Sequence, residues 1–600
     1  MLRHALKWSA VVLVLLAAVL TANTLRRTSQ QIVVPAAARA VIDERAVAER
    51  LARAVQFRTI SYETPSQESR AELLKFQAYL VESFPSAHAA LTREIVGGYS
   101  LLYTWVGRDA RAKPILLMAH QDVVPVAPGT EKQWHADPFG GEIRDGFIWG
   151  RGAWDDKGNL MAILEAIDSL AATGFKPRRT IYLAFGHDEE NGGAEGAAAV
   201  AKLLAKRGVR CEFALDEGML ITEGIMPGVA APVAVVGVAE KGSVTVRLTA
   251  AATAGHSSMP SKTSAIGTLA RSLVRLEASP MPAAIGGVTA DMFDAVVPEM
   301  HGINRVVLSN RWLFGPLIRA QLERAPSTNA MLRTTTAITV IKGGNKENVL
   351  PGQAEALVNF RLIPGDSAAA VVDHVRRVIG DDRVAIEVVP PATEASPVAS
   401  HTSAAYQVLN RTIRESFPDV VVAPGLMIGG TDSRHMGAVA DDIFRFSPVR
   451  ARAEDLSRFH GTDERMAVAN YADLIRFYQA LIRHSAGGEP SAVSGKNEQQ
   501  RPILRDADHE NHDATVGPAW RSGGARRRPC DRSIVSAVKA ATAEEECPSC
   551  NQLSARAHHE RRNRPCVLQP NARSQQYGRR SVRWSREYAF RCAGGPRNGT

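Results

Sequence analysis

The hydrophobic pattern of the first half of the chain alternates short apolar runs with amphipathic stretches. Buried strands are predicted where the apolar runs fall, at residues 114–118, 180–185 and 211–215. Helices are predicted at residues 43–57, 67–84 and 158–170. Continuous apolar strands separated by helices are typical of an α/β fold with a doubly wound, largely parallel sheet that is covered on both faces.

The pattern changes near residue 240. Residues 244–249 alternate apolar and polar side chains, as a strand with one solvated face does. The elements predicted next are a helix, two strands, a helix and a strand, at residues 263–277, 335–342, 354–363, 367–379 and 384–389. This βαββαβ order favours an inserted α+β domain that serves as a lid or a dimerisation domain. Residues 280–333 have no clear period.

These patterns predict five segments. Residues 40–238 form the first part of a catalytic domain, residues 239–394 the inserted domain, and residues 395–485 the second part of the catalytic domain. Residues 1–30 form a membrane anchor or a signal segment. Residues 486–600 are rich in polar residues without sustained periodicity, so we expect a disordered or non-globular tail and assign no function to it.

The N-terminal segment indicates export. An unbroken apolar run from Ala10 to Leu20 is preceded by Arg3 and Lys7 and followed by a pair of arginines. The run is short for a free transmembrane helix of about 20 residues and long enough for a signal peptide. Because the cleavage site is poor, an uncleaved anchor is favoured. The expected location is an inner membrane with an exported catalytic domain, or the periplasm or exterior.

Charge and cysteine content narrow the function classes. The formal net charge is +10, but residues 31–485 contain 48 basic and 50 acidic residues, so the excess positive charge lies at the two ends. No basic stripe with interleaved aromatic residues is present in this body, which argues against nucleic-acid binding. Cys211 is the only cysteine of residues 31–485, so an internal disulfide is excluded there.

Five clusters of acidic or histidine residues follow predicted strands or lie in glycine-rich loops. They are His120-Gln-Asp122, Asp155-Asp156, Asp188-Glu189-Glu190, Asp216-Glu217 and His460-Gly-Thr-Asp463. Each alone has an ordinary explanation, such as a helix cap or a hydrogen-bonded pair. In an open α/β sheet, however, the carboxyl ends of the strands form the crevice where ligands bind. We therefore expect the clusters to converge on one site.

The clusters, in this order, resemble the di-zinc metallopeptidase family that contains aminoacylase, carboxypeptidase S, carnosinase and glutamate carboxypeptidase. The resemblance covers residues 41–484 and is closest to the carboxypeptidase S branch. It is supported by the phrases at residues 56–61 (QFRTIS), 134–141 (WHADPFGG) and 429–433 (GGTDS).

The resemblance implies a site with two Zn²⁺ ions per chain, for which Co²⁺ or Mn²⁺ are substitutes. Asp155 would bridge the ions, His120 and Asp216 would complete the ligands of one, and Glu190 and His460 those of the other. Nitrogen and oxygen ligands with a shared carboxylate suit such a pair. The resemblance also implies that Glu189 is the general base, that Asp122 lies behind His120, and that the peptide bond between Asp155 and Asp156 is cis.

The inserted domain contributes substrate contacts in this family. The resemblance implies that His256 polarises the scissile carbonyl, from the same subunit or from the partner in a homodimer. It also implies that Asn348, Arg361 and Thr431 bind substrate. Arg361 is the candidate for a bidentate hydrogen-bonded contact with the free carboxylate of the substrate.

The predicted function is hydrolysis of an amide bond next to a free carboxylate. The substrate is either a peptide C-terminus or an N-acyl amino acid, and the sequence does not choose between them. Aminopeptidase activity is less favoured, because no second acidic cluster for a substrate amine is evident. The alternative is a catalytically inactive metal-binding or scaffold protein of the same fold, against which the intact Glu189 argues.

Overall fold

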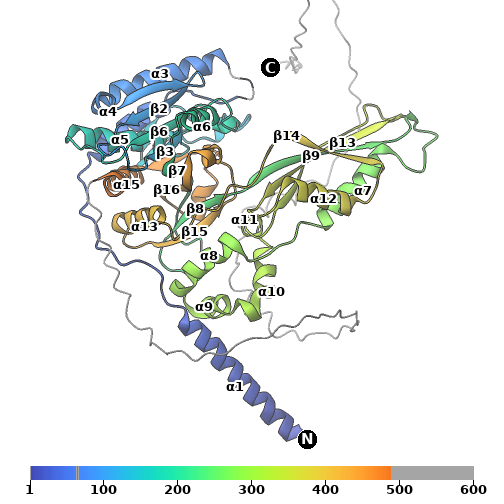
Figure 1. Ribbon diagram of the computed structural model, residues 1–600. Coiled ribbons are helices and arrows are strands. Elements are labelled where there is room, and N and C mark those ends of the chain that lie inside the picture. Colours follow the sequence, from blue (N-terminus) through green and yellow to red (C-terminus); the bar gives the residue numbers. More distant parts are fainter. Residues whose placement is uncertain (1, 63, 65, 488–600) are drawn as a thin grey trace, which may run out of the picture. The chain divides into compact units, whose positions relative to one another are not determined.

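The computed structural model describes residues 2–487, apart from residues 63 and 65. An eight-stranded sheet has the order β1-β2-β6-β3-β7-β16-β8-β15 (Figure 1). Its strands are β1 (Thr92–Val96), β2 (Ser100–Trp105), β3 (Ile115–His120), β6 (Ile181–Gly186), β7 (Cys211–Thr222), β8 (Val233–Glu240), β15 (Val421–Met427) and β16 (Ala440–Ala451). The three strands predicted in the first half of the chain are β3, β6 and β7.

The sheet combines parallel and antiparallel pairs. β3 is parallel to β6 and β7, β7 is parallel to β16, and β8 is parallel to β15. The pairs β1–β2, β2–β6, β7–β8 and β8–β16 are antiparallel. Short connections account for the antiparallel pairs β1–β2 and β7–β8, because a parallel pair needs a longer crossover, usually through a helix. The predicted α/β class is confirmed, with a mixed sheet.

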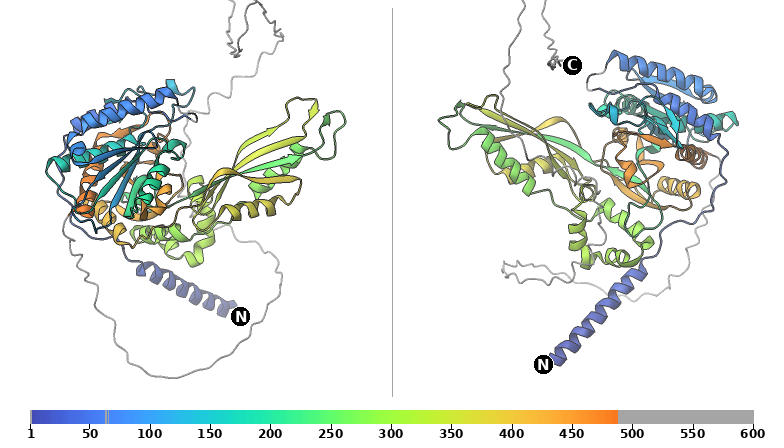
Figure 2. Two further views of the ribbon diagram at one scale, coloured as in Figure 1. Left: turned by 45° about the horizontal axis from the view of Figure 1, so that its top comes forward. Right: turned by 180° about the vertical axis from the view of Figure 1, so that it is seen from behind.

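Helices cover both faces of this sheet (Figure 2). One face packs against α2 (Glu44–Val55), α3 (Gln67–Ser83), α4 (Pro85–Ala90), α5 (Lys157–Ala172), α13 (Ala404–Ser416) and α15 (Val468–Ala486). The other face packs against α6 (Ala197–Lys206) and η4 (Asp432–Ala438). Side chains of β3 alternate between the two cores: Ile115 and Leu117 lie in the first, and Leu116 and Met118 in the second. Burial on both faces explains why this strand is continuously apolar.

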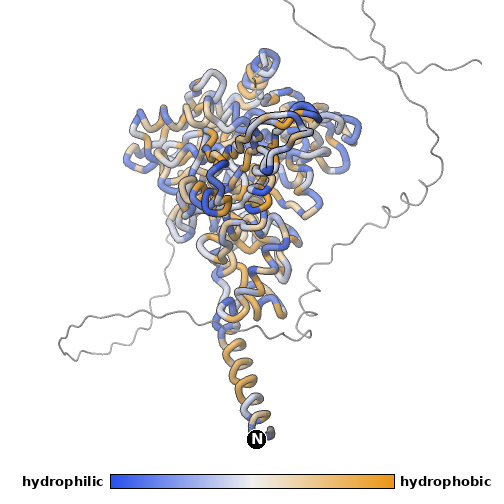
Figure 3. The backbone as a smooth tube through the Cα atoms, turned by 90° about the vertical axis from the view of Figure 1, so that its right-hand side faces the viewer, coloured by the Kyte–Doolittle hydropathy of each residue, from blue (hydrophilic) through white to orange (hydrophobic). Residues whose placement is uncertain are grey.

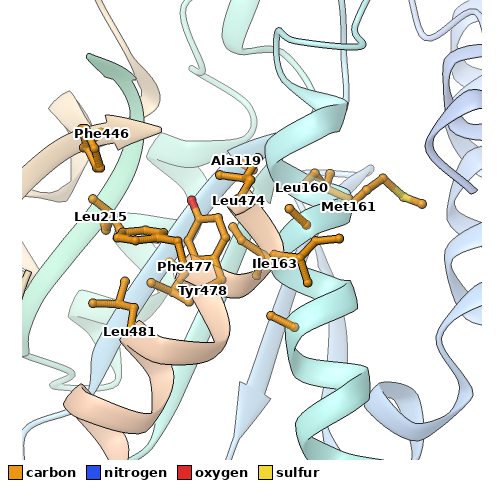
Figure 4. Close-up of a cluster of buried hydrophobic side chains, with 14 of the residues drawn as sticks. Ala119, Leu160, Met161, Ile163, Leu215, Phe446, Leu474, Phe477, Tyr478 and Leu481 are labelled. Carbon is orange, nitrogen blue, oxygen red and sulfur yellow. The ribbon is translucent and has the colours of Figure 1, made fainter. Parts of the chain in front are cut away.

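The first core holds the elements that lead to the candidate site. Ala119 of β3, Leu160 of α5 and Phe477 of α15 lie in one buried cluster (Figure 4). The hydroxyl of Tyr478 on α15 donates a hydrogen bond to the Asn159 side chain on α5 at 2.6 Å. Close packing here fixes the end of β3 and the start of α5, which carry the acidic clusters.

A second sheet is built from residues 242–393. Its order is β11 (Thr335–Gly343), β13 (Gln353–Leu362), β9 (Gly242–Ala251) and β14 (Val384–Thr393), and every pairing is antiparallel. Helices α7 (Ala265–Ala278) and α12 (Ala368–Ile379) bury their apolar faces against it. Burial alternates along β9, as its sequence pattern predicts. These elements follow the βαββαβ order, so the inserted α+β domain is present.

Residues 280–333, for which the sequence shows no period, contain four short helices. They are α8 (Gly287–Val296), α9 (Gly302–Ser309), α10 (Arg311–Leu322) and α11 (Pro326–Ala330). Gly302 and Pro326 are the first residues of α9 and α11, and α10 continues through Gly315 and Pro316, which are unfavourable inside helices. At the N-terminus, α1 (Leu2–Arg26) is long and apolar enough to cross a membrane.

The remaining elements are short. Strands β4 (Glu142–Arg144), β5 (Phe147–Trp149) and β17 (Arg465–Ala467) form one small sheet, and β10 (Gly255–His256) and β12 (Val349–Leu350) form another. Single helical turns are η1 (Glu131–Gln133), η2 (Glu189–Asn191), η3 (Val297–Glu299) and α14 (Ala453–Leu456). The tail predicted at residues 486–600 lies outside the described residues from residue 488 onward.

Candidate metal centre

His120 is the last residue of β3, and its imidazole is buried and oriented from behind. The Nδ1–H donates a hydrogen bond to the backbone oxygen of Asp122 at 2.9 Å. The Nε2 atom therefore faces the Asp155 carboxylate, 3.0 Å from Oδ1. An imidazole whose second nitrogen is held in this way presents one defined nitrogen to a metal ion.

Asp155 lies between two imidazoles. Its Oδ1 atom faces His120, and its Oδ2 atom lies 2.7 Å from Nε2 of His460. Its two oxygens thus face two different imidazoles, an arrangement that suits a carboxylate shared by two metal ions. The peptide bond between Asp155 and Asp156 is cis, as the family resemblance implies.

Glu189 and Glu190 begin a single helical turn after β6. Their backbone N–H groups donate to the two carboxylate oxygens of Asp122 at 3.3 and 3.2 Å. The Glu190 carboxylate lies 3.4 Å from His460 Nε2, whereas that of Glu189 lies 3.6 Å from Arg434. These two neighbours in sequence therefore have different surroundings: the Glu190 carboxylate faces the His460 imidazole, whereas that of Glu189 faces Arg434.

Burial raises the pKa of Glu189 well above its ordinary value, and the negative charges of Asp432 and Glu190 add to the effect. The side chains of Asp155 and Glu190 in turn raise the pKa of His460 to about 10. The cluster thus holds more negative charge than its two imidazoles neutralise. Buried charge of this kind is costly unless a cation is bound, so its chemistry fits metal ions.

Asp216 is buried, and both its carboxylate oxygens accept backbone N–H groups. Oδ1 accepts from Glu217 at 3.0 Å, and Oδ2 accepts from Ser433 at 2.8 Å. The Glu217 carboxylate lies closer to the imidazole, 3.7 Å from His120 Nε2. The structure contains two groups of three residues whose potential ligand atoms lie within 4.8 Å of one another. One group is His120, Asp155 and Glu190, and the other is His120, Asp156 and Glu217. Asp156 and Glu217 were not singled out as ligands from the sequence.

Arg151 and Glu464 join two ligand loops, and sequence reasoning missed them both. Glu464 Oε1 accepts the backbone N–H groups of Gly152, Trp154 and Asp155 at 2.9, 2.9 and 3.1 Å. Its Oε2 pairs with Arg151 at 2.5 Å, and Arg151 donates to the His460 backbone oxygen at 3.2 Å. The two side chains are buried. In the sequence, only their positions could have pointed to them: Arg151 lies in the glycine-rich loop before Asp155, and Glu464 directly follows Asp463.

His256 and Asn348 lie side by side in the second domain. β10 and β12 pair His256 with Val349, and the Ser257 N–H donates to the Asn348 backbone oxygen at 3.0 Å. The His256 side chain is exposed and bonds to Ser258 at 2.7 Å. Among the described residues, no hydrogen bond or ion pair joins this imidazole to the acidic cluster.

The other two predicted substrate-binding residues have contrasting environments. Arg361 lies on β13 with an exposed side chain. Burial lowers the pKa of Lys241 to about 8, and the nearby charge of Arg361 adds to this shift. Thr431 is fully buried, and its hydroxyl donates to Glu240 at 2.8 Å. The exposure of Arg361 leaves its guanidinium able to meet an anionic ligand, whereas the Thr431 hydroxyl is already engaged.

The two-domain α/β fold and the cluster of imidazole and carboxylate ligands define a metal-dependent hydrolase. The chain belongs to peptidase family M20/M25/M40, whose model matches residues 116–484. The family resemblance stated from the sequence is thus confirmed.

Known proteins similar to this chain include a probable carboxypeptidase S-like protein of Dictyostelium discoideum, 44% identical over 78% of this chain and 91% of that protein. An N-fatty-acyl-amino acid synthase/hydrolase of Xenopus tropicalis is 40% identical over 74% of this chain and 86% of its own length. An M20 family metallo-carboxypeptidase of Sulfolobus solfataricus has the same fold, with a TM-score of 0.54 and 18% identity over 74% of this chain and 99% of that one.

Proposed function

We propose that this protein is a zinc-dependent amidohydrolase that cleaves an amide bond next to a free carboxylate. The observation that carries the proposal is Asp155, whose two carboxylate oxygens face His120 and His460. The names of the two relatives, a carboxypeptidase S-like protein and an N-fatty-acyl-amino acid synthase/hydrolase, agree with this bond type. The substrate class is therefore an N-acyl amino acid or a peptide C-terminus.

Two zinc ions are proposed, with cobalt or manganese as substitutes. Asp155 would bridge them, His120 and Asp216 would hold one, and Glu190 and His460 the other. Glu217 is a further carboxylate within reach of His120. When bound, the ions supply Lewis-acid activation of water and of the scissile carbonyl.

Glu189 is proposed as the general base, because its carboxylate is only 10% exposed and lies beside the proposed ligands, paired with Arg434 rather than with one of the two imidazoles. It would take a proton from the attacking water and return it to the leaving nitrogen. Asp122 would position this base and a metal ligand together, since its carboxylate accepts the N–H groups of both Glu189 and Glu190.

The second domain would bind the rest of the substrate. Arg361 would hold the free carboxylate, Asn348 would line the same pocket, and His256 would donate to the oxyanion. Thr431, from the catalytic domain, would line this pocket from the other side. The exposure of His256 is compatible with a role in its own subunit after domain closure or in the partner of a homodimer. The hydroxyl contact of Thr431 with Glu240 makes it the weakest of these assignments.

The N-terminal helix α1 is proposed to anchor an exported catalytic domain in the membrane, a cleaved signal being the alternative. The apolar span is Arg3–Arg26, and its most apolar 18-residue window has a mean hydropathy of 2.1 and is not buried in the protein. At 1.5 Å per residue its length is about 36 Å, which is enough to cross a hydrocarbon core of about 30 Å.

The decisive experiment combines metal analysis with a substrate panel. Purified protein is expected to contain close to two zinc ions per chain and to hydrolyse N-acyl amino acids or dipeptides. A chelator is expected to abolish this activity, and added zinc to restore it. Metal-loaded protein that is inactive on both substrate sets contradicts the proposal and favours the inactive scaffold.

A further inference from the structure

Helices α9 and α10 contact each other, and both expose large apolar side chains. Ile303 is 64% exposed, Trp312 61% and Leu317 42%, and Leu313 is exposed as well. Trp312, Leu313, Pro316 and Leu317 fall on one side of α10 by helical spacing, and Ile318 on the other side is buried. Scattered apolar residues are ordinary on a protein surface, but a contiguous patch of this kind marks an interaction site.

This patch is attached to the C-terminal end of α1. The fully buried Asn310, at the start of α10, donates to the backbone oxygen of Leu20 at 3.2 Å and to the hydroxyl of Thr24 at 3.3 Å. Asn23 donates to the Asn310 side-chain oxygen at 3.0 Å. The indole N–H of Trp312 donates to the same oxygen at 3.2 Å. Trp312 is therefore held level with the last turns of α1.

Basic residues surround the same junction. Residues 302–324 contain four arginines and a single acid, Glu323. Asp294 on α8 pairs with Arg311 at 2.7 Å and also with Arg27, so arginines still outnumber acids at the junction. Arg26 and Arg27 end α1, and Arg305 donates to the Arg27 backbone oxygen at 3.0 Å. A cavity of about 490 Å³ at this junction is lined by Arg26, Arg27 and Trp312, among others. Positive charge next to exposed apolar side chains matches the headgroup region of a membrane that contains anionic lipid.

From these contacts we infer that the α9–α10 face lies on the membrane surface next to the anchor and inserts Trp312, Leu313 and Leu317 at the headgroup level. The inference rests on the proposed role of α1 as a membrane anchor, since the apolar α1 (Figure 3) sets the position of the bilayer. A tryptophan tied to the last turns of a spanning helix lies at the membrane–water interface, where tryptophan is enriched. The face thereby fixes the orientation of the inserted domain above the bilayer.

Tryptophan fluorescence distinguishes the anchor from the surface contact. The full-length protein is reconstituted in vesicles with anionic phospholipid whose acyl chains are brominated near the headgroup, because bromine quenches only tryptophans close to it. Three proteins are compared: wild type, Trp8→Phe and Trp312→Phe. Trp8 lies near the start of α1 and reports the anchor, and Trp312 reports the α9–α10 face.

The expected result is that brominated lipid reduces the Trp8 contribution and reduces the Trp312 contribution by at least about half. If Trp8 is quenched and Trp312 is not, α1 is an anchor but the face does not touch the bilayer. If neither is quenched, the proposed anchor fails, and the inference fails with it. Equal Trp312 emission in brominated and ordinary lipid, as expected if a second copy of this chain covers Trp312, also overturns the inference.

Charge substitution provides a second test. The double variant Leu313→Glu/Leu317→Glu is expected to lose most of the Trp312 quenching, because carboxylates do not enter the acyl-chain region. The control is Ile266→Glu/Val274→Glu, which places two acids at exposed apolar positions of α7. Both variants are expected to hydrolyse a soluble N-acetyl amino acid at the wild-type rate, which verifies folding. Equal Trp312 quenching in both variants contradicts the inference.

Discussion

Glu464 binds the backbone of Asp155: its Oε1 atom accepts the Asp155 N–H at 3.1 Å, while its Oε2 pairs with Arg151. Arg151 also donates to the backbone oxygen of His460. One buried ion pair therefore ties together the loops of two proposed ligands that are about three hundred residues apart in sequence. Partners that orient metal ligands influence metal affinity without touching the metal.

Substituting Glu464→Gln is therefore expected to weaken zinc binding by about 10- to 100-fold, because the Arg151 charge is left unpaired and the Asp155 loop loses a charged acceptor. Competition with a chelator measures the affinity. Glu454→Gln, at an exposed position of α14, is the matched control and leaves it unchanged. Wild-type zinc affinity in the Glu464 variant contradicts the positioning role.

Glu189→Gln is expected to keep both metals and lose at least about 10²-fold in kcat, because a base is removed and no ligand is. Metal content and turnover are measured on the same sample. The adjacent substitution Glu190→Gln is the comparison, and it reduces metal content. Loss of zinc from the Glu189 variant reverses the roles assigned to the two neighbours.

Much of the fold follows from local patterns in the sequence. The strands β3, β6, β7, β9 and β13 each coincide with an apolar or alternating run, because burial on two faces or on one leaves a direct mark on composition. The helices of residues 280–333 leave no such mark. They are short and partly exposed, and α10 contains Gly315 and Pro316, which are unfavourable inside helices, so the sequence shows no sustained apolar period.

Part of the candidate site, like part of the fold, was predictable from the sequence. His120, Asp155, Glu190 and His460 were predicted from the sequence, and the structure brings them together. Glu464 and Arg151 escaped notice because their role depends on backbone contacts made only after folding. The hydrogen bonds of Asp216 and the proximity of Glu217 to His120 likewise depend on how β7 bends after residue 216, which no pattern of side chains encodes.

Lys241 predicts a pH-dependent stability. Burial, together with the nearby charge of Arg361, lowers its pKa from 10.5 to about 8. Between these values the unfolded chain binds the proton and the folded chain does not, so the free energy of unfolding rises with pH. Below pH 8 both states are protonated, and the cost of burying the charge is present in full.

Lys241→Met should remove this dependence. We compare the free energies of unfolding of wild type and variant at each pH. The wild-type value minus the variant value is expected to increase by on the order of 2 kcal/mol from pH 8 to pH 10.5. Urea unfolding across this range measures it. Lys202→Met, at an exposed position of α6, is the control and gives a constant difference. Parallel curves for wild type and Lys241→Met rule out the lowered pKa.

Arg361 tests the carboxylate requirement of the proposed reaction. If its guanidinium holds the substrate carboxylate through two parallel hydrogen bonds, Arg361→Lys is not conservative, because an ammonium lacks the planar fork. Loss of such a contact is worth roughly 2–4 kcal/mol, or about 30- to 1000-fold in kcat/KM. The control is Arg377→Ala, at an exposed position of α12.

The informative comparison uses an N-acyl amino acid and its C-terminal amide. Wild type and Arg377→Ala are expected to prefer the free acid strongly, whereas Arg361→Ala hydrolyses both slowly and at similar rates. Equal wild-type rates on acid and amide remove the carboxylate from the proposed substrate. A preference for the acid that survives in Arg361→Ala moves the contact elsewhere. Asn348 is then the next residue to test, because its position beside the His256 loop leaves it near the same substrate, whereas the Thr431 hydroxyl is bonded to Glu240.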